Sequence, residues 1–180
     1  MLISKQEIFP TLIRKFQFND DEISPLLKEI VRKKEEIKEI SFFYSMNHYE
    51  NYYTDYKKPT VLTEYEALMD LVSNQFASQG YTFELGRYWT AIYGKNSAHN
   101  AHNHNSLKAN FSSILYLTDG GSTSLISSNH TSEQNEHFES AQVGKLIIFP
   151  ASQWHYVTYK ENNERIIISS NLRITGNEYV

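Results

Sequence analysis

Residues 101–121 read AHNHNSLKANFSSILYLTDGG and place two histidines, a short apolar run and a glycine turn in direct succession. His102 and His104 are two residues apart, and side chains at that spacing point to the same face of a β-strand. The run FSSILYL is typical of a buried strand, and DGG is typical of the turn after one. The stretch therefore predicts a strand-rich fold in which two imidazoles converge. His99, three residues before His102, is expected to face elsewhere.

The composition limits what these histidines can do. The chain has 180 residues, which fits a single domain over 1–180, and its net charge of -4 gives no broad basic surface, so nucleic acid is a disfavoured partner. Cysteine is absent, which excludes disulfides and thiolate ligands. The opening MLISKQEIFP lacks the regions of a signal peptide, and no apolar run approaches the roughly 18 residues of a membrane helix. We expect a soluble cytoplasmic protein with no membrane partner; the sequence gives no indication of its oligomeric state.

The first half of the chain, residues 1–80, is expected to be mostly helical support with an edge strand. Residues 7–18, EIFPTLIRKFQF, have the content of a strand, with Pro10 favouring an edge or a bend. Ser24 and Pro25 are a typical N-cap and first helical residue. Apolar residues then recur at helical spacing, and they are Leu26, Leu27, Ile30, Val31, Ile37 and Ile40.

A second helix is expected from Thr63, with Glu66 completing a capping box, to about Gly80. Its apolar residues are assigned to the core, and they are Leu68, Met69, Leu71, Val72 and Phe76. Between the helices, the tyrosine-rich residues 40–60 have no periodicity. They either cover an apolar sheet or form a lid that faces a substrate.

From residue 81 onward the chain reads as short strands separated by turns, which predicts a barrel or sandwich. A third histidine, His155, follows one of these strands in GKLIIFPASQWHYV, residues 144–157. A lone histidine is more often an ordinary polar residue than a ligand. Three that converge, His102, His104 and His155, can bind Fe, Zn, Cu or Ni and leave coordination positions for substrate or water. The spacing therefore favours a catalytic metal site.

The order of motifs over about residues 81–173 resembles a known family. H-x-H, SSILYL, DGG, GKLIIFP, QWH and ERIIISSN occur in the order found in 2-oxoglutarate- and Fe(II)-dependent dioxygenases, in particular the prolyl-hydroxylase-like proteins common in phages and marine bacteria. The resemblance implies a mainly β fold, a double-stranded β-helix or cupin-like jelly roll over 81–175, braced by two N-terminal α-helices. It also implies Fe(II) as cofactor, 2-oxoglutarate as cosubstrate, O2, and hydroxylation of a C–H bond with formation of succinate and CO2.

The resemblance also assigns roles to individual residues. His102 and His155 would be iron ligands, and Arg165 would receive the distal carboxylate of 2-oxoglutarate, for which a planar guanidinium is suited. Tyr116 matches a tyrosine that donates to the same carboxylate. Two alternatives stay open: Tyr116 can be a core residue, and Arg165 can pair with a glutamate at the surface.

The sequence departs from the family at one ligand. Most members have Asp or Glu two residues after the first histidine, where this chain has His104, and residues 85–118 contain no acid. Either His104 is the third ligand, or Asp119 or Glu133 arrives from a loop, or the metal has two protein ligands. The position of His104 on the expected strand favours a face of three histidines, which leaves a bound metal one charge more positive than usual.

Two other classes of protein fit parts of the pattern. A cupin-type metal enzyme shares H-x-H and a later histidine but would not use 2-oxoglutarate, and cupins usually carry a glutamate where this chain has Leu107, Lys108 and Ala109. A non-enzymatic jelly-roll binding module is the other. The sequence leaves the primary substrate open between a protein side chain, such as a prolyl residue, a nucleobase and a small molecule. Residues 94–105 and the tyrosine-rich segment are the expected walls of its pocket.

Overall fold

The computed structural model describes residues 2–8, 11–44, 51–105, 109–127 and 136–176. This part of the chain is mainly β, as the sequence predicts, with two helices. The elements in order are β1 (Leu2–Ile8), β2 (Thr11–Gln17), α1 (Asp20–Tyr44), β3 (Tyr52–Thr54), α2 (Thr63–Ala77), β4 (Tyr81–Tyr93), β5 (Ala98–His102), β6 (Phe111–Tyr116), β7 (Ser122–Ile126), β8 (Glu136–Ser140), β9 (Lys145–Pro150), β10 (Trp154–Thr158) and β11 (Arg165–Gly176).

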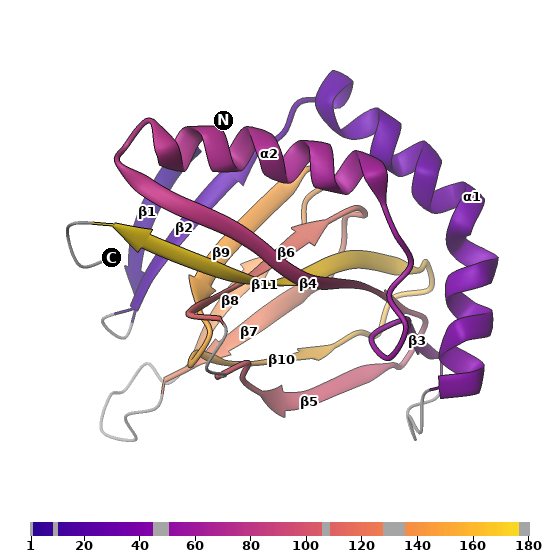
Figure 1. Ribbon diagram of the computed structural model, residues 1–180. Coiled ribbons are helices and arrows are strands. Elements are labelled where there is room, and N and C mark those ends of the chain that lie inside the picture. Colours follow the sequence, from indigo (N-terminus) through magenta and orange to yellow (C-terminus); the bar gives the residue numbers. More distant parts are fainter. Residues whose placement is uncertain (1, 9–10, 45–50, 106–108, 128–135, 177–180) are drawn as a thin grey trace.

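The strands form two antiparallel sheets. The larger sheet has seven strands in the order β1-β2-β9-β6-β11-β4-β3, and the smaller has four in the order β5-β10-β7-β8. Figure 1 shows α1 and α2 beside the larger sheet, with β5, β10 and β7 on the side away from the helices. No helix in the described ranges is long and apolar enough to cross a membrane.

Two apolar cores lie on the two faces of the larger sheet. Residues of α1 and α2 form one core with side chains of that sheet, including Leu115 and Ile168. The other core lies between the sheets and includes the neighbouring residues Tyr116 and Ile167, together with Leu125 of β7. Because successive side chains of a strand point to opposite faces, a strand buried on both sides is apolar along its whole length. This explains the uninterrupted apolar runs ILYL, residues 114–117, and III, residues 166–168.

The first helix begins earlier than the sequence predicts. It begins at Asp20, and Asn19 before it forms a reciprocal capping box with Glu22, because Asn19 Oδ1 accepts from the Glu22 N–H at 3.0 Å and Glu22 Oε2 accepts from the Asn19 N–H at 2.8 Å. Ser24 is therefore not the N-cap, and Pro25 lies inside the helix. The prediction followed Ser-Pro, whereas the Asn-x-x-Glu pattern five residues earlier satisfies two backbone donors.

The second helix does begin at Thr63, but its cap comes from the other helix. Glu29 of α1 accepts the backbone N–H of Thr63 at 3.3 Å and that of Glu64 at 3.0 Å. Glu66 instead accepts from the hydroxyl of Tyr88 at 2.8 Å. The predicted capping box between Thr63 and Glu66 is wrong, because the buried carboxylate of Glu29 accepts the Thr63 N–H that Glu66 would have accepted.

The predicted core residues of α2 are buried except Leu71, and the apolar residues predicted for α1 are buried or partly buried except Val31. Leu68, Met69, Val72 and Phe76 are buried, and so are Leu26, Ile30 and Ile37. Leu71 is 40 % exposed and Val31 is 74 % exposed, because each lies at the edge of its apolar stripe. The predicted N-terminal strand is a hairpin of β1 and β2, and Pro10 lies outside the described residues.

Candidate metal site and cavity

The three predicted ligands come together from two strands and from the segment that follows one of them. His102 ends β5 and lies directly opposite His155 of β10 in the antiparallel ladder. His104 follows the end of β5, where its backbone N–H donates to the carbonyl of Ala151 at 2.8 Å. One ring nitrogen of each histidine lies within 4.8 Å of the others. The prediction that both H-x-H histidines lie on a strand is wrong for His104, which the bond to Ala151 positions instead.

Each of the three imidazoles has its Nδ1 next to an oxygen acceptor. The acceptors are the carbonyl of Asn100 for His102 at 2.8 Å, the carbonyl of Gln153 for His155 at 3.1 Å, and Oδ1 of Asn171 for His104 at 3.0 Å. An amide oxygen can only accept, so Nδ1 carries the hydrogen and donates it in all three cases. Every Nε2 is left with a free lone pair, which is the form that a metal ion requires.

The electrostatics of the site also fit a metal. Burial lowers the pKa of His102 and of His104, and it holds the pKa of His155 well below the ordinary value. The three rings are therefore neutral near pH 7. Nε2 of His104 is buried and has no hydrogen-bond partner. A buried nitrogen with an unused lone pair is costly unless something binds it, and a divalent cation would satisfy it.

A fourth histidine enters the same region, which the sequence did not predict. His99 stacks on His102 with ring centroids 4.2 Å apart. Between the pairs His155–His102 and Val157–His99, β10 advances two residues while β5 advances three, so β5 contains a β-bulge. The extra residue turns His99 to the same side as His102. The expectation that His99 faces elsewhere is wrong, because a spacing of three residues reverses the face only in a regular strand.

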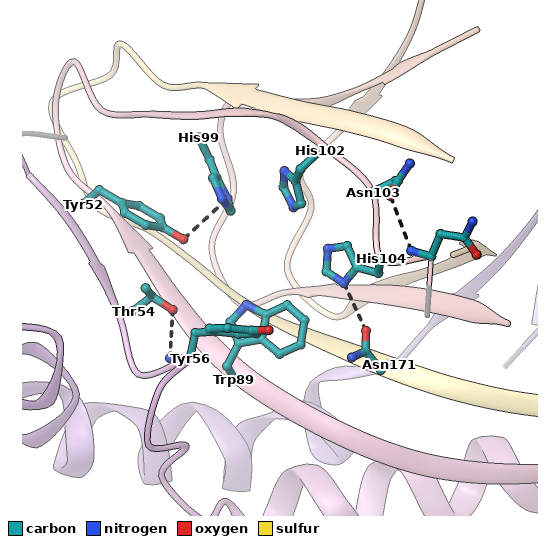
Figure 2. Close-up of a pocket in the computed structure, with 10 residues that line it drawn as sticks. Tyr52, Thr54, Tyr56, Trp89, His99, His102, Asn103, His104 and Asn171 are labelled. Carbon is teal, nitrogen blue, oxygen red and sulfur yellow. Dashed lines mark hydrogen bonds between the residues drawn. The ribbon is translucent and has the colours of Figure 1, made fainter. Parts of the chain in front are cut away.

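A cavity of about 350 Å³ lies in front of the histidines. It is lined by Tyr52, Thr54, Tyr56, Trp89, His99, His102, Asn103, His104, Asn105 and Asn171 (Figure 2). Trp89 stacks on His104 at 5.3 Å with an angle of 16° between the rings, so it forms the floor beside a candidate ligand. Both predicted wall segments, residues 94–105 and the tyrosine-rich stretch, contribute to this lining.

A buried carboxylate holds the tyrosine wall in place. Asp55 accepts the backbone N–H of Thr60 at 2.8 Å and that of Thr90 at 2.7 Å, which fastens the turn after β3 to β4. This turn carries Tyr56, whose ring meets Trp89 edge to face at 5.0 Å. Tyr56 therefore belongs to a fixed wall of the cavity, and Tyr52 is 6 % exposed. The segment lines a candidate substrate space and packs on the sheet at the same time.

A smaller inner cavity of about 20 Å³ lies between the two sheets, behind the histidines. Its lining includes His102 and His155 at one end and Tyr93 and Ile167 further in. On β11, every second side chain points to the same face of the strand. From Arg165 onward, the residues on this face are Arg165, Ile167, Ser169 and Asn171. This row of side chains runs from Asn171, which is hydrogen-bonded to His104, to the buried Arg165.

Arg165 is fully buried and has no carboxylate partner among the described residues. Its terminal nitrogens donate to the carbonyl of Ser122 at 2.7 Å and to Oγ1 of Thr123 at 2.8 Å. The Tyr116 hydroxyl donates to the same Thr123 oxygen at 3.0 Å. The guanidinium carbon lies 5.5 Å from the ring centre of Tyr93 and 5.4 Å from that of Tyr116. The surface ion pair considered for Arg165 is therefore absent from this part of the chain.

Of the two acids considered as alternative ligands, the one that the structure describes is not in the site. Asp119 accepts the backbone N–H of Val143 at 2.9 Å and is not in the histidine group. Glu133 lies outside the described residues. Burial raises the pKa of Tyr116 and that of Tyr93 to about 12, so both phenols stay protonated beside Arg165 and can donate hydrogen bonds.

Comparison with known proteins places this geometry in a recognised fold. No protein-family model matches the sequence, and no curated protein matches it either. Among solved structures, a prolyl-4-hydroxylase from Pseudomonas putida is 21% identical with a TM-score of 0.59, over 94% of this chain and 91% of that one. A prolyl hydroxylase from Trichoplax adhaerens, in complex with a hypoxia inducible factor peptide fragment, is 11% identical with a TM-score of 0.65, over 88% and 82%.

A viral collagen prolyl hydroxylase from Paramecium Bursaria Chlorella virus-1, solved as a complex with 2-oxoglutarate, is 14% identical with a TM-score of 0.57, over 89% of this chain and 95% of that one. At these identities the likeness concerns the fold. The two-sheet antiparallel fold is one found in 2-oxoglutarate and Fe(II) oxygenases, including these prolyl hydroxylases. The mainly β fold with antiparallel sheets and two helices agrees with the coarser part of what the sequence resemblance implied.

Proposed function

We propose that the protein is a 2-oxoglutarate- and Fe(II)-dependent oxygenase that hydroxylates a C–H bond, with formation of succinate and CO2. The observation that carries the proposal is the set of three neutral imidazoles, each with a ring nitrogen within 4.8 Å of the others, on a fold found in this class of oxygenase. The core of the enzyme would be a double-stranded β-helix over residues 81–175, with residues 1–80 as its support, in one domain.

His102, His104 and His155 would hold the metal, with His104 in the position of the usual carboxylate. When bound, Fe(II) supplies the activation of O2 that is coupled to oxidative decarboxylation of the keto acid. The chain contributes the fixed orientation of the imidazoles, through the Nδ1 hydrogen bonds described above. It also contributes a cavity in front of the ligands that is large enough for part of a substrate.

Arg165 and Tyr116 would bind the distal carboxylate of 2-oxoglutarate. A buried guanidinium without an acid is costly, and a ligand carboxylate would compensate its charge. Because Tyr116 stays protonated, it can donate to the same group. The inner cavity has room for about one water molecule, so binding of the keto acid requires the side chains between His155 and Arg165 to move apart.

A cupin-type enzyme that does not use 2-oxoglutarate is the second candidate, because it shares the metal ligands. The decisive experiment is anaerobic titration of the purified protein with Fe(II) and then 2-oxoglutarate, followed by visible absorption. We expect a charge-transfer band that disappears on admission of O2 as succinate forms. His155→Ala should give no band, whereas His137→Ala, a histidine outside the metal group, should retain it. Tight metal binding without a band would contradict the proposal and favour the cupin-type site.

A further inference from the structure

The residues that line the large cavity limit which chemical groups can bind there, and the proposed reaction alone does not say which groups these are. None of its ten lining residues is Asp, Glu, Lys or Arg. Among the described residues, two cations lie beside the lining residue Tyr56: the guanidinium of Arg87 is 4.6 Å from its ring centre and the ammonium of Lys57 is 5.9 Å from it. In the metal-free protein, a charged group placed deep in the cavity would lose its hydration and find no opposite charge among the lining side chains, which is unfavourable.

His99 differs from the other three histidines in its hydrogen-bond environment. Its Nδ1 faces a hydroxyl group, that of Tyr52, at 3.5 Å, whereas the other three face amide oxygens. A phenol can donate as well as accept, so the Tyr52 hydroxyl can serve as the donor to Nδ1 of His99. When Tyr52 donates to Nδ1, the hydrogen of the His99 ring lies on Nε2. Figure 2 shows this ring between Tyr52 and His102, pointing into the cavity.

We propose that His99, oriented by Tyr52, is a substrate-positioning residue that donates a hydrogen bond from Nε2 to an uncharged acceptor, such as an amide carbonyl oxygen, on a group that lies against Trp89. The cavity thus selects for an uncharged, flat or ring-shaped part of the substrate with a carbonyl or hydroxyl oxygen. This inference deepens the proposed function by naming the chemistry of the substrate. It rests on that function only for the statement that the bound group is oxidised.

The test uses fluorescence and needs neither metal nor keto acid. The chain has two tryptophans, so Trp154→Phe, which changes an exposed residue on β10, leaves Trp89 as the single reporter in the cavity. This protein is titrated with three probes of similar shape, which are benzamide, benzoate and benzylamine. We expect benzamide to change the fluorescence at concentrations at least tenfold lower than either charged probe.

Variants in the same background then assign the interaction. His99→Leu should weaken benzamide binding at least threefold, and Tyr52→Phe should weaken it in the same direction because the ring loses its orienting donor. His99→Gln, which can still donate a hydrogen bond, should restore part of the affinity. Tighter binding of benzoate than benzamide would overturn the inference and point to recruitment of anions by Arg87 and Lys57. Unchanged benzamide affinity in both His99→Leu and Tyr52→Phe would overturn the role of the pair.

The outcome is separable from that of the proposed function. If Fe(II) and 2-oxoglutarate give no charge-transfer band but benzamide binds as described, the cavity selects an uncharged ligand and the oxygenase proposal fails. If the band forms and benzamide shows no preference over its charged analogues, the oxygenase stands and the assignment of His99 fails.

Discussion

His155 and His102 lie directly opposite each other across the β10–β5 ladder, with ring centroids 4.2 Å apart. Two of the three candidate ligands are therefore brought together by strand register. A one-residue slip of β5 along β10 would turn the side chain of His102 to the other face of the sheet. The third ligand, His104, depends instead on a backbone bond to Ala151 and on the side chain of Asn171.

Removal of the hydrogen bond to His104 should weaken metal binding without removing a ligand. In Asn171→Leu the Nδ1 of His104 loses its acceptor, so the ring orientation is no longer fixed. We expect the affinity for Fe(II), or for Ni(II) as a stable substitute, to fall about 10- to 100-fold. Asn171→Asp is the matched control, since its carboxylate still accepts from Nδ1 and should preserve binding. Equal affinities in wild type and Asn171→Leu, measured by calorimetry, would show that Asn171 does not orient the ligand.

Substitution of Arg165 should lower the affinity for 2-oxoglutarate strongly and the thermal stability of the protein only slightly. Arg165→Met removes a buried charge that has no acid partner in the described residues, so we expect little loss of thermal stability. The affinity for 2-oxoglutarate should fall at least tenfold. Arg165→Lys keeps the charge but not the planar fork, and should have intermediate affinity. A large loss of stability with unchanged keto-acid binding would instead assign Arg165 to structure alone.

The contact between the helices predicts a stability effect far from the metal site. Glu29 accepts backbone N–H groups at the start of α2, so Glu29→Ala leaves these donors without a partner. We expect the free energy of unfolding to fall by about 1 to 2 kcal/mol, as for loss of an N-cap. Glu29→Gln retains an acceptor oxygen and should lose less. Metal affinity, measured on the folded variants, should stay at the wild-type value, and an unchanged denaturation midpoint in Glu29→Ala would refute the capping role.

A buried carboxylate on β8 predicts how stability depends on pH. Burial alone raises the pKa of Glu139, but hydrogen bonds from Lys145 and Lys15, each at 2.8 Å, and from His137 at 3.2 Å outweigh it, and the net pKa is lowered. A pKa lowered by folding contributes stability above the unfolded value of about 4.3, which is lost as the pH falls through the folded pKa.

We therefore expect the thermal midpoint of the wild type to fall as the pH decreases below about 4.5, and Glu139→Gln to show a smaller decrease over the same range. Near pH 7 the variant should be the less stable protein, because the two lysines lose their charged acceptor. Parallel curves for the two proteins, measured by thermal denaturation between pH 3 and 7, would show that Glu139 does not control acid stability.

Strand periodicity predicted the β part of the fold because that signal is local. The runs after residue 81 were apolar on both faces, as buried strands require, and the spacing of the helical residues identified α1 and α2. The helix starts were harder to predict, since Glu29 caps a helix that begins more than thirty residues further along the chain. A contact between distant residues leaves no pattern in the local sequence.

In the candidate site, too, some residues were predicted from the sequence and others were missed. The three histidines that the structure brings together were predicted from their spacing and order, and Arg165 was predicted from the resemblance to the oxygenases. His99 was missed because alternation assumes a regular strand, and nothing in SAHNAH marks an irregular one. Asn171 was missed as well, since its role depends on the packing of β11 against the end of β5. A cluster of histidines within a few residues of one another was the available signal for His99.

The bulge in β5 has an effect beyond the direction of His99. Asn100, within the bulge, supplies the carbonyl oxygen that accepts from His102. A single inserted residue thus joins the orientation of a candidate metal ligand to the placement of His99 in the cavity. At the same spacing in a regular strand, His99 would point to the face opposite His102, so the bulge is what brings both side chains to one side. The spacing H-x-x-H-x-H therefore allows His99 and His102 to share one side only in combination with this bulge.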